Sequence, residues 1–250
     1  MKPKREAVLL SAALLAYSNG LALIAMRRGR AADAAYRWTN PVLMALLLPA
    51  LSRARRLPVS AILLDAGLHT RNLPQALGGG LLLGVLLSGP PLIFFARPLV
   101  LDEPLEYGRI DRLTPRAFWW RMLVELPFGI AMFEELTFRG LLFSAWSRAA
   151  SPRTANLATA ATFAAWHFAV SIDTMRHTNI QSAAVRVPKL VQRHANALGV
   201  GGGMAVTAVG GLLFSGLRLR VGGSVFAPAL AHLIVDASMV AALHRRGQRQ

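Results

Sequence analysis

Long apolar stretches alternate with short basic segments along the whole chain. The first stretch, Ala7–Met26, has lysines and arginines on both sides. About 20 apolar residues are enough for a helix to cross the roughly 30 Å hydrocarbon core of a bilayer. This stretch is too long for the apolar core of a cleavable signal peptide, and it ends in arginines instead of a small-residue cleavage site. It therefore predicts a retained transmembrane helix.

The same pattern recurs to the end of the chain. Val59–Leu68 is too short to span and predicts an interfacial helix or a loop. The polar segment 101–121 predicts a loop that leads to an interfacial segment with Phe118, Trp119 and Trp120 at headgroup depth, and 173–193 predicts a loop. The further predicted spans are Tyr36–Leu51, Leu73–Leu101, Met122–Trp146, Ala155–Ile172, Ala195–Leu217 and Gly223–Leu243. The pattern thus predicts an all-α polytopic membrane bundle of about seven transmembrane helices, forming a single domain over residues 1–250.

Composition supports a membrane protein and excludes several other classes. Only 16% of the residues are charged, against about 25% in a typical soluble domain. The chain has no Cys, which excludes a disulfide scaffold, a cysteine-ligated metal centre and a cysteine protease. The formal net charge of +16 is spread over the loops instead of forming one basic patch, so no nucleic-acid partner is expected. Basic residues occur in both sets of alternate loops, and the positive-inside rule therefore assigns no orientation.

Four of the few acidic residues lie inside predicted spans: Glu125, Glu134, Glu135 and Asp236. A carboxylate at the centre of a lipid-facing helix costs at least about 2.5 kcal/mol, so these side chains are expected to face the bundle interior or a wet cavity. Glu125 lies near the start of its span and also fits an interfacial position. A small proton-coupled transporter would use such acids, but the two halves of the chain show no repeat symmetry of the transporter kind.

The spacing of the acids distinguishes two roles. Glu135 and Arg139 are four residues apart on one helix face, in the favourable order for an ion pair. Glu134 lies about 100° further round the helix and is less fully compensated. Such a carboxylate is a candidate general base. A Glu–Arg pair in a span is as often a packing contact as a functional site, so the pair alone identifies no activity.

Two later spans add histidines. Phe163 and His167 share one helix face, as do His232 and Asp236 on the last span. A lone His in a span is more often a helix contact than a catalyst. The chain contains no Ser–His–Asp set and no H-E-x-x-H zinc pattern.

In order, these residues resemble the three motifs of the CAAX-protease and bacteriocin-processing family, also called the Abi family, of glutamate-type intramembrane endopeptidases. The matches are E-E-x-x-x-R at Glu134–Arg139, F-x-x-x-H at Phe163–His167 and H-x-x-x-N/D at His232–Asp236. The resemblance covers about residues 123–240, whereas the N-terminal spans match only as generic membrane helices. Three motifs in order on three separate spans are a specific signal.

The resemblance implies that activated water hydrolyses peptide bonds within the membrane. It assigns Glu134 as the general base and His167 as a residue that helps to hold the water. Glu135 and Arg139 are assigned as the supporting ion pair. Phe163, from the second motif, is assigned to substrate binding.

His232 and Asp236 are assigned to the scissile carbonyl and its oxyanion. An Asn in the third motif can donate an amide hydrogen bond to an oxyanion, whereas an ionised Asp cannot. Asp236 must therefore be protonated and donate, or it must accept the ring N–H of His232 and orient that ring. We favour the donor role, because a protonated Asp and an Asn share it.

The resemblance leaves several properties as expectations. No metal cofactor is expected, although Glu134, His167 and His232 would be the ligands if zinc were bound. A catalytically idle scaffold or immunity protein of the same family is the main alternative, and the intact first motif favours the enzyme. We expect a multi-pass protein of the bacterial cytoplasmic (inner) membrane, surrounded by lipids, that acts on a membrane-associated peptide or protein. Neither the substrate's identity nor the oligomeric state follows from the residues.

Overall fold

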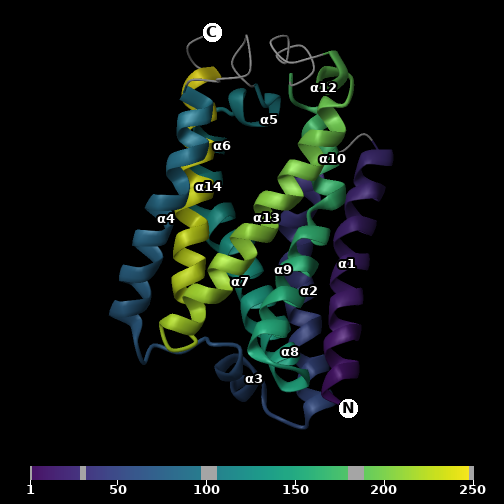
Figure 1. Cartoon of the computed structure of the whole chain (residues 1–250), viewed down its shortest axis with the longest axis vertical. Coiled ribbons are helices and arrows are strands. Elements are labelled where there is room, and N and C mark those ends of the chain that lie inside the picture. Colours follow the sequence, from purple (N-terminus) through teal and green to yellow (C-terminus); the bar gives the residue numbers. More distant parts are fainter. Residues whose placement is uncertain (1, 29–31, 97–105, 180–188, 248–250) are drawn as a thin grey trace.

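The computed structural model describes residues 2–28, 32–96, 106–179 and 189–247, and these residues are almost entirely helical (Figure 1). The described residues form no β-strand, and one isolated bridge joins Tyr107 to Thr178. The all-α prediction is confirmed. The end of the predicted span Leu73–Leu101 and the polar residues 102–105 lie outside the described residues, as do residues 180–188 of the predicted loop 173–193. The described part of that loop differs from the prediction, because Lys189–Arg193 is helical.

Long helices run along the molecule, and α13 crosses them obliquely (Figure 1). Two π-helical segments, η1 (Arg121–Ala131) and η2 (Leu136–Leu142), join α6, α7 and α8 into one continuous helical run. The helices are α1 (Pro3–Arg27), α2 (Ala32–Arg55), α3 (Val59–Asp65), α4 (Leu73–Ala96), α5 (Gly108–Asp111), α6 (Pro115–Trp120), α7 (Met132–Glu135), α8 (Phe143–Ala149), α9 (Pro152–Trp166), α10 (Phe168–Arg176), α12 (Lys189–Arg193), α13 (Ala195–Arg220) and α14 (Phe226–Gly247).

Three of the described helices are long and apolar enough to cross a membrane. They are α1, α13 and the Phe226–Arg245 part of α14. A fourth apolar helix, Leu73–Gly89, is shorter than this criterion requires. Exposed valines on α13, such as Val206 and Val209, give this helix the apolar outer surface that lipid chains require. The chain is thus an integral membrane protein, while the figure of about seven spans stays a prediction.

Two predicted spans have other bounds in the structure. The predicted span Ala155–Ile172 is divided into α9 and α10, which are separated at His167. The span predicted to start at Met122 belongs to a helical run that already begins at Pro115. Thr114 caps this run, because its hydroxyl oxygen accepts a hydrogen bond from the backbone N–H of Ala117. Proline is favoured in the first helical turn, so the segment predicted as a loop already contains a helix start.

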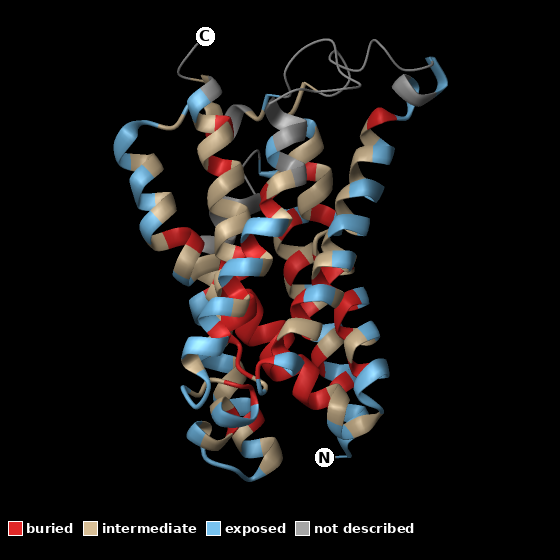
Figure 2. Cartoon of the chain, turned by 60° about the vertical axis from the view of Figure 1, so that its left-hand side comes forward, coloured by how far each residue is buried: buried red, intermediate tan, exposed pale blue. Residues whose placement is uncertain are grey.

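The core surrounds the middle of this helical run. Every residue of η2 is buried. Figure 2 shows the buried residues gathered in the interior of the half of the bundle that contains the N-terminus, while the outer faces are exposed. Aromatic side chains from two helices pack edge to face here, with the ring centroid of Phe138 4.9 Å from that of Phe163 and 5.2 Å from that of Trp166. The residues that bear the first motif therefore lie in a buried, well-packed region.

Glycines bring the last helix close to its neighbour α4. A Cβ added at Gly84 would lie only 2.9 Å from the Cβ of Ile234, and one added at Gly80 would lie 2.6 Å from the carbonyl oxygen of Ala227. In lipid, where the hydrophobic effect does not drive helices together, small residues of this kind allow close van der Waals packing. The contact sets the position of α14, which carries His232 and Asp236.

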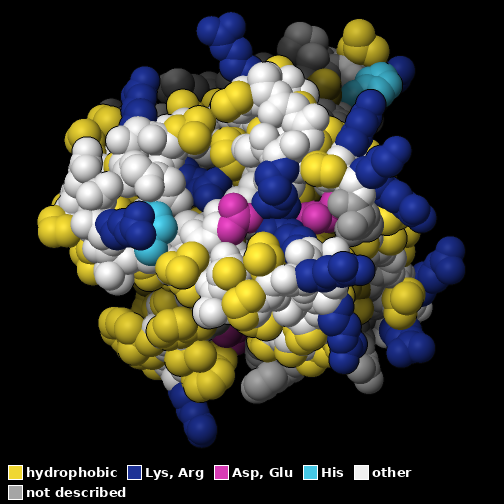
Figure 3. Space-filling view, turned by 90° about the horizontal axis from the view of Figure 1, so that it is seen from below, with side chains coloured by type: hydrophobic (Ala, Val, Ile, Leu, Met, Phe, Trp, Pro, Cys, Tyr) yellow, Lys and Arg dark blue, Asp and Glu magenta, His cyan; other side chains and the backbone are white. Residues whose placement is uncertain are grey.

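A network of ion pairs joins four helices at the end of the bundle that contains the N-terminus. Arg55 and Arg148 both bind Glu6, at 2.6 and 2.7 Å, and both bind Asp65, at 2.9 and 2.6 Å. Figure 3, a view of this end, shows acidic side chains enclosed by basic ones. These contacts tie α1, α2, α3 and α8 together outside the apolar core.

Candidate active site

The three motifs, which come from different helices, meet around the carboxylate of Glu134. Its Oε2 atom lies 4.0 Å from Nε2 of His167 and 3.9 Å from Nε2 of His232. Glu134 lies in α7, the single α-helical turn between the two π-helical segments. π-Helical turns inside α-helices often mark functional sites. The structure therefore brings together the carboxylate and the two histidines that the sequence singled out.

His167 occupies the break between α9 and α10. Its backbone N–H bonds to Ala164 instead of continuing the α-helical pattern to Phe163. Its ring Nδ1–H donates to the carbonyl of Phe163, at 2.8 Å. Because a carbonyl only accepts, this bond places the proton on Nδ1 and turns Nε2 toward Glu134.

His232 is oriented in the same way by a different partner. Its Nδ1–H donates to Oε1 of Glu135, at 2.9 Å. Its Nε2 faces Glu134 and lies 3.4 Å from Oδ2 of Asp236. Both imidazole rings are thus held through Nδ1 and present Nε2 to the same carboxylate.

Glu135 and Arg139 form the predicted ion pair. Their side chains are 3.0 Å apart and wholly buried. The Arg139 guanidinium also lies over two aromatic faces, 4.1 Å from the ring centroid of Phe163 and 5.3 Å from that of Phe214. Cation–π contacts of this kind are strongest where water is excluded. The buried ion pair also orients His232, because Glu135 accepts a hydrogen bond from the ring of that histidine.

Phe163 does not occupy the position expected of a substrate-binding residue. Its side chain is buried, with 3% exposed, and it does not line the cavity described below. Its ring makes a T-shaped contact with that of His167, with the centroids 4.6 Å apart, and it also lies under the Arg139 guanidinium. Phe163 therefore contacts two residues of the motifs.

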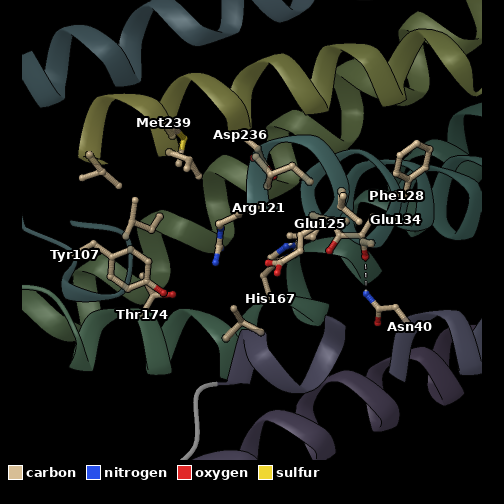
Figure 4. Close-up of a pocket in the computed structure, with 18 of the residues that line it drawn as sticks. Asn40, Tyr107, Arg121, Glu125, Phe128, Glu134, His167, Thr174, Asp236 and Met239 are labelled. Carbon is tan, nitrogen blue, oxygen red and sulfur yellow. Dashed lines mark hydrogen bonds and ion pairs between the residues drawn. The ribbon is translucent and has the colours of Figure 1, made fainter. Parts of the chain in front are cut away.

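A cavity of about 630 Å³ opens beside the three motifs (Figure 4). Glu134, His167 and Asp236 line it, and most of the remaining wall is apolar. Its volume lies within the range of about 300–1,000 Å³ typical of ligand pockets. The polar groups of the motifs are therefore accessible to a bound molecule.

Asn40 of α2 also lines the cavity, and the sequence did not single it out. Its Nδ2 donates to the carbonyl of Gly129 at 3.0 Å, while its Oδ1 accepts from the hydroxyl of Tyr17 at 2.9 Å. The amide thus links α1 and α2 to the segment just before Glu134 (Figure 4). A buried amide within the predicted span Tyr36–Leu51 was the available signal, but its partners are distant in sequence.

The donors around Glu134 do not form a metal site as arranged. Among the described residues, no three His, Asp or Glu side chains lie in the geometry needed to hold one metal ion. The ligands of tetrahedral zinc, with bonds of about 2.0–2.1 Å, lie roughly 3.3 Å from one another. The separations of 3.9 and 4.0 Å from Glu134 to the two histidines are longer.

These features define an α-helical integral membrane protein with a buried carboxylate–histidine site next to a cavity. Residues 115–238 match the family model described as type II CAAX prenyl endopeptidase Rce1-like, and all three motifs lie within this match. The chain therefore belongs, through its C-terminal half, to the CAAX-protease and bacteriocin-processing family, as the motifs indicated. No curated protein and no solved structure matches the chain. Membership of a protease family supports a peptidase in general terms.

Replacing Glu135 by Gln tests the double contact of this carboxylate. The change leaves Arg139 buried without its counter-ion, and removing one partner of a buried ion pair typically costs about 3–5 kcal/mol. We expect a lower melting temperature in detergent together with lost activity. Glu134→Gln is the matched control, because Glu134 makes no ion pair with an arginine in the described structure, and its melting temperature should stay close to that of the wild type. Equal stability of both variants would contradict the supporting role of Glu135.

Proposed function

We propose that the protein is an intramembrane endopeptidase in which Glu134 activates water to hydrolyse a peptide bond of a membrane-associated peptide or protein. The observation that carries the proposal is the position of Glu134, which faces Nε2 of both His167 and His232 at the wall of the cavity. Family membership supports a protease, and the apolar helices support a membrane location. We further propose the bacterial cytoplasmic membrane as that location.

The distances around Glu134 suit a bridging water. Separations of 3.9 and 4.0 Å are too long for direct hydrogen bonds, and polar groups more than about 3.5 Å apart can be joined through a water molecule. A water held by Glu134 and His167 can attack the scissile carbonyl carbon while its proton passes to the carboxylate. The tetrahedral intermediate then breaks its C–N bond, and the protonated Glu134 returns the proton to the leaving amine. These reaction steps conserve atoms and charge and need no further reactant.

We assign His232 and Asp236 to the side of the site that faces the carbonyl oxygen. Nδ1 of His232 is engaged by Glu135, so Nε2 and the neighbouring carboxyl of Asp236 are the groups on the substrate side. A protonated Asp236 can donate a hydrogen bond to the developing oxyanion, as an Asn would in its place. We assign Asp236 this donor role.

Glu134→Gln should abolish proteolysis while the protein remains folded and inserted. The amide nearly matches the carboxylate in shape, but it cannot accept the proton of the attacking water. Turnover should be measured on the purified protein in lipid nanodiscs. Glu125→Gln is the control, since it removes another carboxylate that lines the same cavity and should leave kcat nearly unchanged. If Glu134→Gln retains even a tenth of the wild-type turnover, Glu134 is not the base.

Substitutions at Asp236 separate its two candidate roles. In the donor role, Asp236→Asn supplies a permanent donor, so activity should persist and extend to higher pH. Loss of an oxyanion donor typically lowers kcat by about 10²–10³, and Asp236→Ala should show a loss of that size. If Asp236 only accepts the ring N–H of His232, Asp236→Asn should show no extension to higher pH. A nearly normal Asp236→Ala enzyme would contradict both roles.

Activity should be insensitive to chelators, because the proposed reaction uses no metal ion. Turnover should be compared before and after incubation with EDTA or phenanthroline, followed by dialysis. Restoration of a lost activity by Zn²⁺ would show the proposal to be wrong on this point and would make Glu134, His167 and His232 the candidate ligands.

A further inference from the structure

The cavity contains one strongly basic side chain. Among the described residues that line it, Arg121 is the only Lys or Arg, and three carboxylates line it as well. In Figure 4, Arg121 extends into the cavity between Tyr107 and Thr174 on one side and His167 and Glu134 on the other. The proposed chemistry uses neither Arg121 nor Glu125, so these two charges need another explanation.

The surroundings of Arg121 determine what the cavity accepts. The wall also includes Val124, Val170, Met239 and Leu243, which suit apolar side chains of a bound peptide. A negative group entering the cavity would be repelled by the carboxylates of Glu125 and Glu134, which line it. Among the described residues of the wall, Arg121 is the only Lys or Arg that attracts such a group.

The chemistry of the guanidinium narrows the choice of ligand. Its five N–H donors lie in a planar fork that matches a carboxylate through two parallel hydrogen bonds. This number of donors allows Arg121 to keep its contacts within the protein and still bind a carboxylate. Glu125, four residues further along the same helical run, places a carboxylate in the same wall.

We propose that Arg121 is a specificity-determining residue that binds a carboxylate of the substrate peptide, either its C-terminus or an acidic side chain. The proposal rests on the peptidase function proposed above and extends it to the class of substrate. The peptide lies along the apolar wall with its scissile bond at Glu134 and its carboxylate at Arg121.

The helix limits how far the carboxylate lies from the cleaved bond. Arg121 precedes Glu134 by thirteen positions on one continuous helical run. At about 1.5 Å per residue this corresponds to roughly 20 Å at most, which an extended peptide covers with about six residues. The carboxylate is therefore expected within about six residues of the scissile bond.

The test compares peptides that differ only in this carboxylate. The full-length protein in lipid nanodiscs is given internally quenched decapeptides with one shared core of Val and Leu. One pair ends in a free acid or an amide, and a second, amidated pair carries Glu or Gln within six residues of the cleaved bond. We expect the acidic member of one pair to have a KM about tenfold lower, at similar kcat, which is typical of a charge-assisted hydrogen bond. The pair that shows the difference identifies the source of the carboxylate.

Variants of two arginines decide whether the preference comes from Arg121. Arg121→Gln should remove the difference between the paired peptides, whereas Arg116→Gln, at an exposed position in α6, should preserve it. Arg121→Glu should reverse the preference toward a peptide with Lys at the same place. If the wild type treats both members of each pair alike, or if Arg121→Gln weakens all peptides equally, the proposal is wrong.

Binding to the inactive Glu134→Gln protein separates this proposal from the peptidase function. The Kd of the same peptides, carrying a fluorophore, is measured by anisotropy with and without Arg121→Gln. A carboxylate preference that disappears with Arg121 supports the site even if no peptide is cleaved, in which case only the peptidase function fails for these substrates. Equal Kd values within both pairs overturn the proposal whatever the cleavage result.

Discussion

One buried carboxylate oxygen holds the site together. Oε1 of Glu135 accepts hydrogen bonds from Arg139, at 3.0 Å, and from His232, at 2.9 Å. It therefore connects the helix of the first motif with that of the third. A charge that is wholly buried is tolerated only when it is paired and hydrogen-bonded, so these contacts have to form together as the helices pack. The double contact orients His232 toward Glu134, which in turn defines where a water molecule and a substrate carbonyl can lie.

The surrounding helices meet this constraint by close packing. Phe163 covers the Arg139 guanidinium, and its backbone carbonyl orients His167, so a single residue of α9 serves both parts of the site. On the opposite side, the contact of Gly84 with Ile234 brings α14 close to α4. In lipid, such contacts and interhelical hydrogen bonds replace the hydrophobic effect as the source of helix association. The polar site is thus enclosed by some of the closest packing in the bundle.

The cavity next to the site determines which molecules can reach Glu134. Most of its wall is apolar, which suits peptides with apolar side chains. The ionisable groups are confined to a few positions, with Glu134 and Asp236 next to the histidines and with Glu125 and Arg121 also in the wall. Opposite charges therefore lie at different positions in the cavity, which agrees with the proposed binding of an extended peptide in one orientation.

The sequence by itself determined that the protein is helical and membrane-embedded, because apolar length and scarce charge reflect the bilayer directly. It also determined the family and the Glu135–Arg139 pair, since a spacing of four residues on a helix is a local property. Only the tertiary structure decided that His232 binds Glu135, that the chain breaks at His167, and that Asn40 and Arg121 line the cavity. These features depend on which helices meet and how they are rotated, and contacts between residues distant in the chain leave no periodic signal within one helix.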